Sequence, residues 1–454
     1  FKEYHDVQIH KILRQSAHEY WFGTENGLYI YEENTGKVSR LQKKYNDPYA
    51  VSDNVIYSFY KDKEGGTWIG TFFGGINYYA ASYNQFRKYF PASGGNSLSG
   101  NLVHEICSDQ YNNIWIGTED AGLNKLNVST GAIEHFMPCP GSISYSNIHG
   151  LIAAGNELWI GTYEHGLDVM NILTGKVTRH YDAHKDKSSF GSNFIVALYK
   201  TRAGDILVGT WGGLFRYNRR ADNFVQLPFF KTQVQAIHED EHGTIWASTY
   251  GNGVYYFNQA TGKGGILKTG NGLINNYVNN LYEDSRGQMW FCTEAGLCRY
   301  VPATGKFTSY TIENGLPDNQ VFRVLEDNAH QLWVSTSKGL MRFDPATGKK
   351  EVFTTANGLL TEQFNYNSAY KAPDGTLYFG SVKGLISFNP LNFTIHPYVP
   401  PVYITGLQVN NKPVPINGKG SPLQQSITYT THLTLPYDRS NIALDIAALS
   451  YTIP

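Results

Sequence analysis

The sequence lacks an excess of charge of either sign. Its 454 residues include 37 Lys and Arg against 38 Asp and Glu, and charged residues make up only 17% of the chain. Nucleic acids and anionic membrane surfaces are normally bound by clustered, excess lysine and arginine. The charge balance therefore predicts no nucleic-acid partner for this region, and the composition is that of a folded rather than a disordered chain.

Cysteine and long apolar runs are also scarce. Cys107, Cys139, Cys292 and Cys298 form no Cys-x-x-Cys pair, which argues against a zinc knuckle or a disulfide scaffold, so no metal or cofactor is predicted. No apolar run reaches the roughly 18 residues of a membrane-spanning helix. Because Phe1 opens the chain without a signal-like segment, we expect either a cytosolic protein or a piece of a longer one.

Glycine and aromatic residues, by contrast, are abundant, with 46 Gly, 33 Tyr, 24 Phe and 8 Trp, which is typical of turn-rich β-structure. A motif of the form Trp-Ile-Gly-Thr-x-x-Gly-Leu recurs at intervals of about 45 residues, the length of a four-stranded propeller blade. The nine copies begin at Trp21, Trp68, Trp115, Trp159, Leu207, Trp246, Trp290, Trp333 and Tyr378.

Two positions of the repeat predict structural roles. The seven Trp residues of the motif are expected to pack between blades. Five units place an Asn 14 residues before the motif, where its side chain is expected to hold a loop by hydrogen bonds to the backbone. These residues are Asn54, Asn101, Asn193, Asn276 and Asn319.

The number of units predicts how the chain is divided. Propellers usually close with four to eight blades, so the nine units predict an all-β chain with one seven-bladed propeller at about 93–397. Residues 1–92 would be the last two blades of a preceding propeller. After 398 the repeat ends, and β segments at 402–409, 426–435 and 442–449 predict the start of a β-sandwich.

The repeats and the segment that follows them resemble a known family. The C-terminal part contains Pro400-Pro401-Val402-Tyr403-Ile404-Thr405-Gly406-Leu407, and then Leu433, Leu435, Tyr437 and Asn441. Together with the nine motifs, this resembles the periplasmic sensor region of hybrid two-component system regulators of glycan-degrading Bacteroidetes. There, two seven-bladed propellers precede a three-tyrosine (Y_Y_Y) β-sandwich, a membrane helix, a histidine kinase, a receiver and a DNA-binding domain.

The resemblance implies a function for the region. It would be a periplasmic, non-enzymatic sensor of an oligosaccharide from a complex glycan, and the full-length protein would be a histidine kinase that induces polysaccharide-utilisation genes. The resemblance further implies a homodimer formed through the C-terminal sandwich and an inner-membrane helix outside this segment. The kinase elements are absent from the sequence, and the tyrosines that name the sandwich would lie beyond Pro454.

One motif suggests metal chemistry and is better explained by the repeat. His238-Glu239-Asp240-Glu241-His242 matches His-Glu-x-x-His, which binds zinc when both imidazoles share one face of a helix. Here the string aligns with Tyr282-Glu283-Asp284 of the next unit. It is therefore predicted to form the turn between the first two strands of a blade.

Repeat proteins usually bind ligands through positions that vary between units. In this chain the variable positions follow the Thr of each motif, on one face of the propeller around the central channel. Aromatic side chains there suit the apolar faces of sugar rings, with polar neighbours for the hydroxyls. The candidate ligand-binding residues are Trp211, Tyr163, Glu164, His165, Tyr250, Asn252, Lys338 and Lys383.

Two alternatives remain open at this point. A propeller glycoside hydrolase or lyase would need a convergent carboxylate pair, for which Glu119 and Glu164 are the candidates. A scaffold that binds protein through its propeller face would use the same variable turns.

Overall fold

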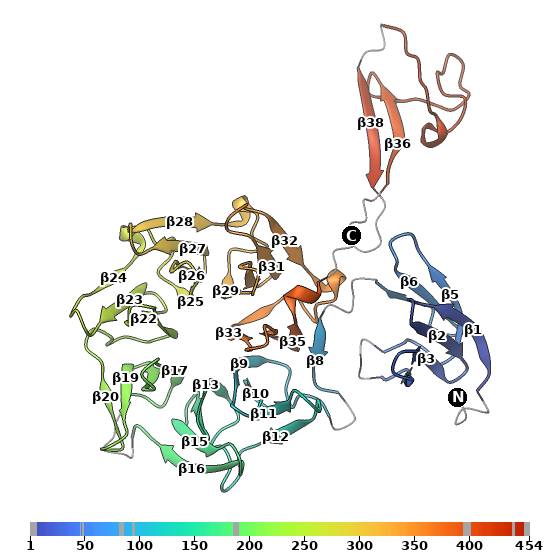
Figure 1. The fold of residues 1–454 in the computed structure, drawn as a ribbon. Coiled ribbons are helices and arrows are strands. Elements are labelled where there is room, and N and C mark those ends of the chain that lie inside the picture. The colour runs from blue at the N-terminus through green and yellow to red at the C-terminus, as the bar shows by residue number, and fades with distance from the viewer. Residues whose placement is uncertain are drawn as a thin grey trace. The chain divides into compact units, whose positions relative to one another are not determined.

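The computed structural model describes residues 7–45, 47, 50–80, 86–92, 96–184, 190–393, 401–437 and 441–448. Within these ranges the chain is antiparallel β-structure with short 3-10 turns and no α-helix (Figure 1), so the predicted all-β class is confirmed. None of the described helices is long and apolar enough to cross a membrane. The chain divides into two compact units, of which one holds residues 44–50 and 83–393.

This unit is a ring of seven four-stranded sheets, here called blades one to seven. Blades one to three are β9 (Val103–Ser108), β10 (Asn113–Thr118), β11 (Leu123–Asn127) and β12 (Ile133–Phe136); β13 (Ile148–Ala154), β14 (Glu157–Thr162), β15 (Leu167–Asn171) and β16 (Lys176–Tyr181); and β17 (Ile195–Lys200), β18 (Ile206–Thr210), β19 (Gly213–Asn218) and β20 (Asn223–Gln226).

Blades four to six are β21 (Ala236–Glu239), β22 (Thr244–Ser248), β23 (Val254–Asn258) and β24 (Gly264–Leu267); β25 (Val278–Glu283), β26 (Met289–Thr293), β27 (Gly296–Val301) and β28 (Lys306–Tyr310); and β29 (Val321–Glu326), β30 (Leu332–Thr336), β31 (Gly339–Phe343) and β32 (Lys350–Phe353). The 3-10 turns that follow them are η2 (Thr269–Asn271), η3 (Ile312–Asn314) and η4 (Thr355–Asn357).

The seventh blade takes strands from both ends of the unit. Its first three strands are β33 (Phe364–Lys371), β34 (Leu377–Ser381) and β35 (Gly384–Phe388), followed by the turn η5 (Pro390–Asn392). Its outermost strand is β8 (Arg87–Tyr89), which pairs with β35. The predicted boundary at 93 is wrong by this strand, because β8 precedes the first motif of the ring and yet completes its last sheet.

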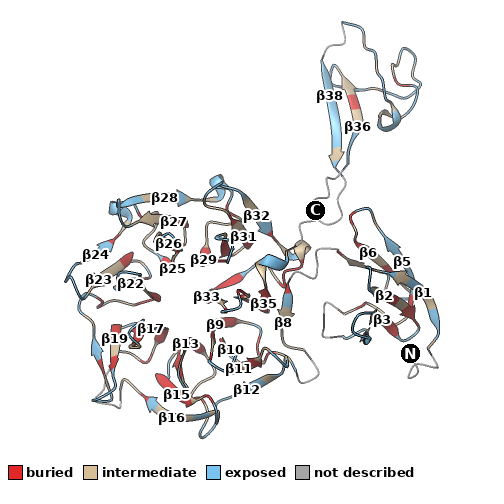
Figure 2. Cartoon of the chain, in the orientation of Figure 1, coloured by how far each residue is buried: buried red, intermediate tan, exposed pale blue. Residues whose placement is uncertain are grey.

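The ring closes at its centre as well. The first, or inner, strands of successive blades are neighbours around the axis, and β33 lies beside β9. Figure 2 shows outer strands such as β28 mostly exposed, whereas burial is greatest on the motif strands, of which β26 and β30 are buried throughout. Six of the seven motif Trp residues are buried as predicted, whereas Trp68 is half-buried.

One aspartate builds the turn between the first two strands of a blade. In blade five, Asp284 Oδ1 accepts hydrogen bonds from the backbone N–H groups of Arg286 and Gln288, at 3.0 and 2.9 Å, and Oδ2 accepts one from Trp290 Nε1 at 2.8 Å. The same Asp to Trp bond joins Asp62 to Trp68, Asp109 to Trp115, Asp240 to Trp246 and Asp327 to Trp333. The repeated Asp therefore fixes the turn and satisfies the buried indole at once.

The loops that lead into the inner strands are held by the predicted asparagines. Asn193 Oδ1 accepts the backbone N–H of Ala183 at 2.7 Å, and Asn319 Oδ1 accepts that of Ile312 at 2.9 Å. Asn54 and Asn276 make equivalent bonds. For these four residues, the predicted structural role is confirmed.

The N-terminal part contains two blade-like sheets. The first is β1 (Ile9–Arg14), β2 (Glu19–Thr24), β3 (Gly27–Glu32) and β4 (Lys37–Leu41), and the described strands of the second are β5 (Ile56–Lys61), β6 (Thr67–Thr71) and β7 (Ile76–Tyr79).

The C-terminal part is a three-stranded sheet in the order β37-β36-β38. Its strands are β36 (Val402–Val409), β37 (Lys412–Pro413) and β38 (Ile442–Ala448). The strand predicted at 426–435 is wrong: the 3-10 turn η6 (Ile427–Tyr429) lies there, and a hydrogen bond from Thr430 Oγ1 to the carbonyl of Ser426 favours a local turn over strand pairing. The predicted boundary at 397/398 lies outside the described residues.

Candidate functional site at the channel mouth

The turns after the motif Thr residues are fixed by the Thr hydroxyl. Thr162 Oγ1 donates to the carbonyl of Gly166 at 2.8 Å and accepts the N–H of His165 at 3.0 Å. The first turn residue is also tied to the start of its own inner strand, as Tyr163 N–H is to the carbonyl of Asn147. These first turn residues form what we call the rim of the channel mouth: Glu119, Tyr163, Trp211, Tyr250, Glu294, Ser337 and Val382.

Aromatic side chains gather on one side of the rim. Trp211 stacks on Phe194, with ring centroids 4.2 Å apart and an angle of 6° between the planes. Tyr163 meets Phe194 edge to face at 4.9 Å, and Tyr250 meets Tyr277 at 4.8 Å. Trp211, Tyr250 and Tyr277 are between 45% and 50% exposed, so their rings are accessible to a ligand although their positions are fixed.

Bulges in the inner strands place further side chains below the rim. In blades one and two the pairing skips His104 and His149, the extra residue of each bulge, and a bulge re-aims its extra side chain. The two imidazole rings lie 3.7 Å apart, and Tyr366 meets His104 edge to face at 4.5 Å. We call His104, His149 and Tyr366 the floor of the channel mouth.

Tyr366 reaches this position because blade seven breaks the repeat. Between Phe364 and Ala369, β33 carries a longer irregularity than the other inner strands, and Asn367 adopts a left-handed conformation with φ 57°. The extra residues of the seventh inner strand therefore lie in the channel instead of extending the sheet.

Below the floor, hydrogen bonds span the channel. Asn367 of blade seven accepts a bond from Asn280 of blade five at 2.6 Å and donates to the carbonyl of Gln235 of blade four at 3.0 Å. Arg323 of blade six donates to Asn280 Oδ1 and, at 2.8 Å, to the carbonyl of Ala369. The channel is thus crossed by protein beneath the floor.

The floor is electrostatically unusual. Burial lowers the pKa of His149 to about 4 and the pKa of His104 well below its ordinary value, with the neighbouring His149 as a second cause. Burial also raises the pKa of Glu105 to about 8 against the opposing effect of Arg323, and that of Tyr366 to about 12. At neutral pH the two imidazoles and Tyr366 are therefore uncharged.

The structure brings some of the predicted residues together. Tyr163 lies edge to face with Trp211, with ring centroids 6.2 Å apart, and both Tyr163 and Tyr250 are close enough to Tyr366 to influence its pKa. These residues share the channel mouth with Glu119, which also acts on Tyr366.

The other predicted residues lie further out. His165 stacks on Tyr145 at 4.1 Å, and Asn252 donates to Thr232. Lys338 pairs with Asp318 at 2.9 Å, while Glu164 and Lys383 are exposed in their turns. The binding roles of all eight residues stay predictions.

Sequence reasoning missed Phe194, Tyr277, His104, His149 and Tyr366. Phe194 and Tyr277 each stand immediately before an inner strand, a variable position that could have been searched in the same way as the turns. The floor residues required the bulges to be known. One partial signal was available, because blade seven has Phe364 at the register position where five units carry Asn.

The His238–His242 string forms the end of β21 and the following turn, as predicted. His238 Nε2 lies 3.1 Å from Glu283 Oε2, and the side chain of His242 is exposed. The described residues contain no group of three or more His, Cys, Asp or Glu side chains placed to hold a metal ion.

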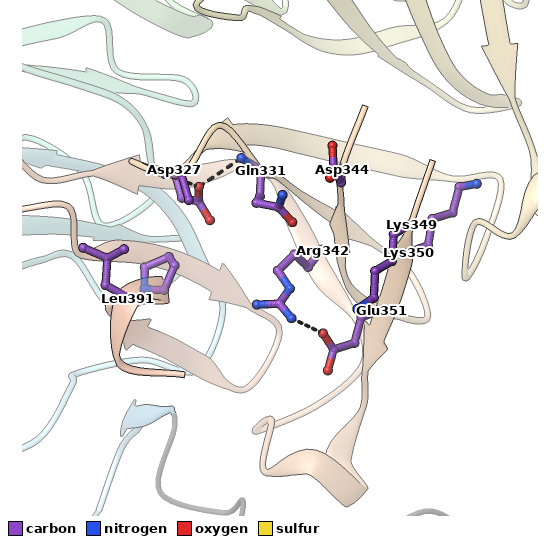
Figure 3. A pocket seen from close by; sticks show the side chains of 10 residues that line it. Asp327, Gln331, Arg342, Asp344, Lys349, Lys350, Glu351 and Leu391 are labelled. Carbon is purple, nitrogen blue, oxygen red and sulfur yellow. Dashed lines mark hydrogen bonds and ion pairs between the residues drawn. The ribbon is translucent and has the colours of Figure 1, made fainter. Parts of the chain in front are cut away.

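A second concavity lies at the opposite face, where the Asp turns are (Figure 3). It has a volume of about 290 Å³ and is lined by Asp327, Gln331, Arg342, Glu351 and Leu391, among others. Three of its charged residues are engaged within the chain: Arg342 pairs with Glu351, and Asp327 accepts bonds from Gln331 and Trp333. The channel mouth is therefore the better candidate site.

Comparison with known proteins defines the class. Residues 50–73, 97–120, 272–295 and 315–338 match the family described as Two component regulator propeller. The matched segment 97–120 contains an inner strand, a motif strand and the rim residue Glu119. Four of the nine repeats are therefore similar to the propeller repeats of two-component regulators.

Individual relatives agree with this class. The extracellular domains of two hybrid two-component systems from B. thetaiotaomicron are similar in fold, with TM-scores of 0.75 and 0.58 and identities of 23% and 22% over 90% and 98% of this chain. A histidine kinase from Formosa agariphila is 31% identical over 88 residues, 19% of this chain. The chain spans 56% and 60% of the two structures and 6% of the kinase. The resemblance to the sensor regions of hybrid two-component systems is confirmed.

Proposed function

We propose that this extracellular sensor region binds an oligosaccharide at the channel mouth. The observation that carries the proposal is two groups of packed aromatic rings at the channel mouth, one formed by Tyr163, Phe194 and Trp211 and the other by Tyr250 and Tyr277. Large, rigid aromatic side chains provide contact area at a low entropic cost. Sugar rings present apolar C–H faces that suit such surfaces.

Polar groups on the rim support the same ligand class. Glu294 accepts hydrogen bonds from Asn279 at 2.7 Å and from Gln320 at 2.8 Å, so its carboxylate is held in one orientation. Glu119 lies near Tyr366. Oriented carboxylates and a phenol supply acceptors and a donor for sugar hydroxyls.

The proposal extends to the whole protein. Its periplasmic location, inner-membrane anchor, dimerisation through the C-terminal sheet and control of polysaccharide-utilisation genes are proposed from the resemblance to hybrid two-component systems. In this scheme the N-terminal sheets end a preceding propeller, and residues from about 398 begin the Y_Y_Y sandwich. Binding would signal only if two states of the protein differ in their contacts with the ligand.

The test is calorimetric titration of the 454-residue chain with a panel of neutral and acidic tetrasaccharides. We expect at least one of them to bind, and Trp211→Ala to weaken its binding by about 2 kcal/mol, as for a central aromatic anchor. Tyr111→Ala is the matched control, since Tyr111 is 43% exposed in a turn of the opposite face. Absence of binding by the whole panel, or equal losses in both variants, would contradict the proposal.

The hydrolase or lyase alternative is tested with the same samples. Glu164 is exposed in its turn, unlike the general acid of a glycosidase, which is held in an apolar pocket. We therefore expect no new reducing ends and no unsaturated products after prolonged incubation with the bound saccharide. Turnover that is lost in Glu119→Gln would replace the sensor proposal with an enzymatic one.

A further inference from the structure

The two floor histidines have hydrogen-bonding capacity that the folded chain does not use. His104 is 0% exposed and His149 is 5% exposed. Neither ring nitrogen of His104, nor Nε2 of His149, has a hydrogen-bond partner among the described residues. Buried polar atoms are almost always paired, because an unpaired buried group destabilises the folded chain. Two such groups lie side by side, and the ring of His149 also meets the rim residue Tyr163 at 5.1 Å, which indicates a place for a polar ligand group next to the rim.

The charge around the floor restricts which polar group fits. Glu105 follows His104 on β9, and Tyr366 of β33 and Tyr163 of the rim contact the histidine pair. Glu119 is the nearby rim acid. Arg323, the cation that acts on Glu105, is held by Asn280 and Ala369. An anionic ligand group would therefore meet neutral imidazoles and a carboxylate on the rim.

The bonds that cross the channel restrict how the ligand enters. Asn367, Asn280 and Gln235 join blades seven, five and four beneath the floor. A chain cannot pass beyond this point, so only the end of an oligosaccharide reaches the histidines.

We propose that the floor of the channel mouth is a subsite for the uncharged, hydroxyl-bearing terminal residue of an oligosaccharide, with His104 and His149 hydrogen-bonding its hydroxyl groups. The inference rests on the proposed function. It adds that the sugar residue at the floor is uncharged and stands at the end of the oligosaccharide. A neutral imidazole offers one donor and one acceptor, which matches a hydroxyl that both accepts and donates. A carboxylate or sulfate would lose its hydration there without gaining a cation.

The first experiment is calorimetric titration of the 454-residue chain with matched tetrasaccharides, namely tetragalacturonic acid and tetramannuronic acid and their carboxyl-reduced, neutral counterparts. We expect a neutral member to bind at least tenfold more tightly than its acidic partner. His149→Phe keeps a flat ring but removes the hydrogen bonds, and should weaken that binding at least tenfold. His238→Gln, on the other end of an inner strand, should leave it within twofold.

The second experiment measures the wild-type chain itself and uses the variants only to assign its signals. Imidazole ¹⁵N spectra of the wild-type chain, assigned with His104→Gln and His149→Phe, should show two neutral rings at pH 6 whose nitrogen shifts change when the neutral tetrasaccharide is added. Rings protonated at pH 6, or shifts that do not respond to a saccharide that binds, would overturn the inference.

The outcomes separate the two proposals. Binding that depends on Trp211 but prefers the acidic partner, or that survives His149→Phe, overturns the terminal subsite and leaves the rim site standing. Failure of every tetrasaccharide to bind overturns the proposed function and the subsite with it.

Discussion

The two faces of the propeller are built by the same repeat but treat their polar groups differently. At the face of the Asp turns, the recurring aspartate is fully hydrogen-bonded within the chain. Asp284, for example, accepts bonds from two backbone N–H groups and from the indole of Trp290. At the channel mouth, side chains differ from blade to blade, aromatic rings are exposed, and His104 keeps both ring nitrogens without a partner among the described residues.

The contrast teaches where stability and recognition reside in this fold. A group whose bonds are complete inside the chain contributes to folding and has little left for a ligand. A side chain that stands on a fixed backbone and has unused hydrogen-bonding groups contributes less to folding, but it can bind a ligand. Thr162 illustrates the division, because its hydroxyl fixes the turn that presents Tyr163 without constraining what the tyrosine contacts.

The largest expected effect comes from removing a hydrogen-bond acceptor at the face of the Asp turns. Asp284→Ala leaves the buried Trp290 indole and two turn N–H groups without their acceptor, and should lower the free energy of unfolding by about 3 kcal/mol. Urea unfolding followed by tryptophan fluorescence measures this. Asp120→Ala, in an exposed mouth turn, is the control and should change stability by less than about 0.5 kcal/mol. Similar losses in both variants would erase the difference between the faces.

A smaller effect, on pH dependence, tests the channel side. Between pH 4.5 and about 8 the folded chain keeps a proton on Glu105 that the unfolded chain has lost, so this group lowers stability as the pH rises. Between about pH 4 and 6.5 the unfolded chain binds a proton that folded His149 does not, so stability falls as the pH falls. Folded His104, whose pKa is also lowered, acts in the same sense as His149, so the three groups together predict maximum stability near pH 6.5.

Glu105→Gln should remove the alkaline loss, so that its stability advantage over the wild type grows by about 2 kcal/mol between pH 6.5 and 8.5, with little advantage at pH 4.5. Urea unfolding at pH 4.5, 6.5 and 8.5 measures both limbs. A variant curve parallel to that of the wild type between pH 6.5 and 8.5 would show that the channel does not bury this carboxyl group.

The smallest expected effect concerns Lys338, which follows the rim residue Ser337. Lys338 pairs with Asp318, but its side chain is 70% exposed, and such pairs contribute at most about 1 kcal/mol. Lys338→Ala should therefore change stability by less than about 0.5 kcal/mol and leave saccharide affinity within twofold, in contrast to Trp211→Ala. A larger loss of affinity, measured by titration, would place the binding site nearer to blade six. It would also indicate that the ligand is an acidic sugar that pairs with the lysine.

The fold could be predicted from the sequence because the repeated residues make hydrogen bonds to groups that are close to them in the chain. The spacing of Asp284 and Trp290, and that of Asn319 and its motif, reflect hydrogen bonds within one blade or to the adjoining loop. The strand expected at 426–435 failed because alternating apolar residues do not reveal that side chains such as Thr430 stabilise a local turn.

The candidate site was predictable only in part. Trp211, Tyr163 and Tyr250 could be found because they occupy aligned turn positions. His104, His149 and Tyr366 could not, because their orientation depends on bulges and on contacts between blades that are distant in the sequence. Lys338 and Lys383 were selected for charge, and the pairing of Lys338 with Asp318 follows from a loop geometry that the sequence does not show.

The closing strand β8 has a consequence for how this unit is made. Tyr89 and its partner Leu385 are about 300 residues apart, and such pairings form slowly because a long loop must close first. During synthesis β8 leaves the ribosome before all seven inner strands, and its sheet does not exist until β35 has followed. Six blades can assemble in order as they emerge, whereas the ring stays open, with the edge of β35 unpaired, until the oldest strand joins the youngest.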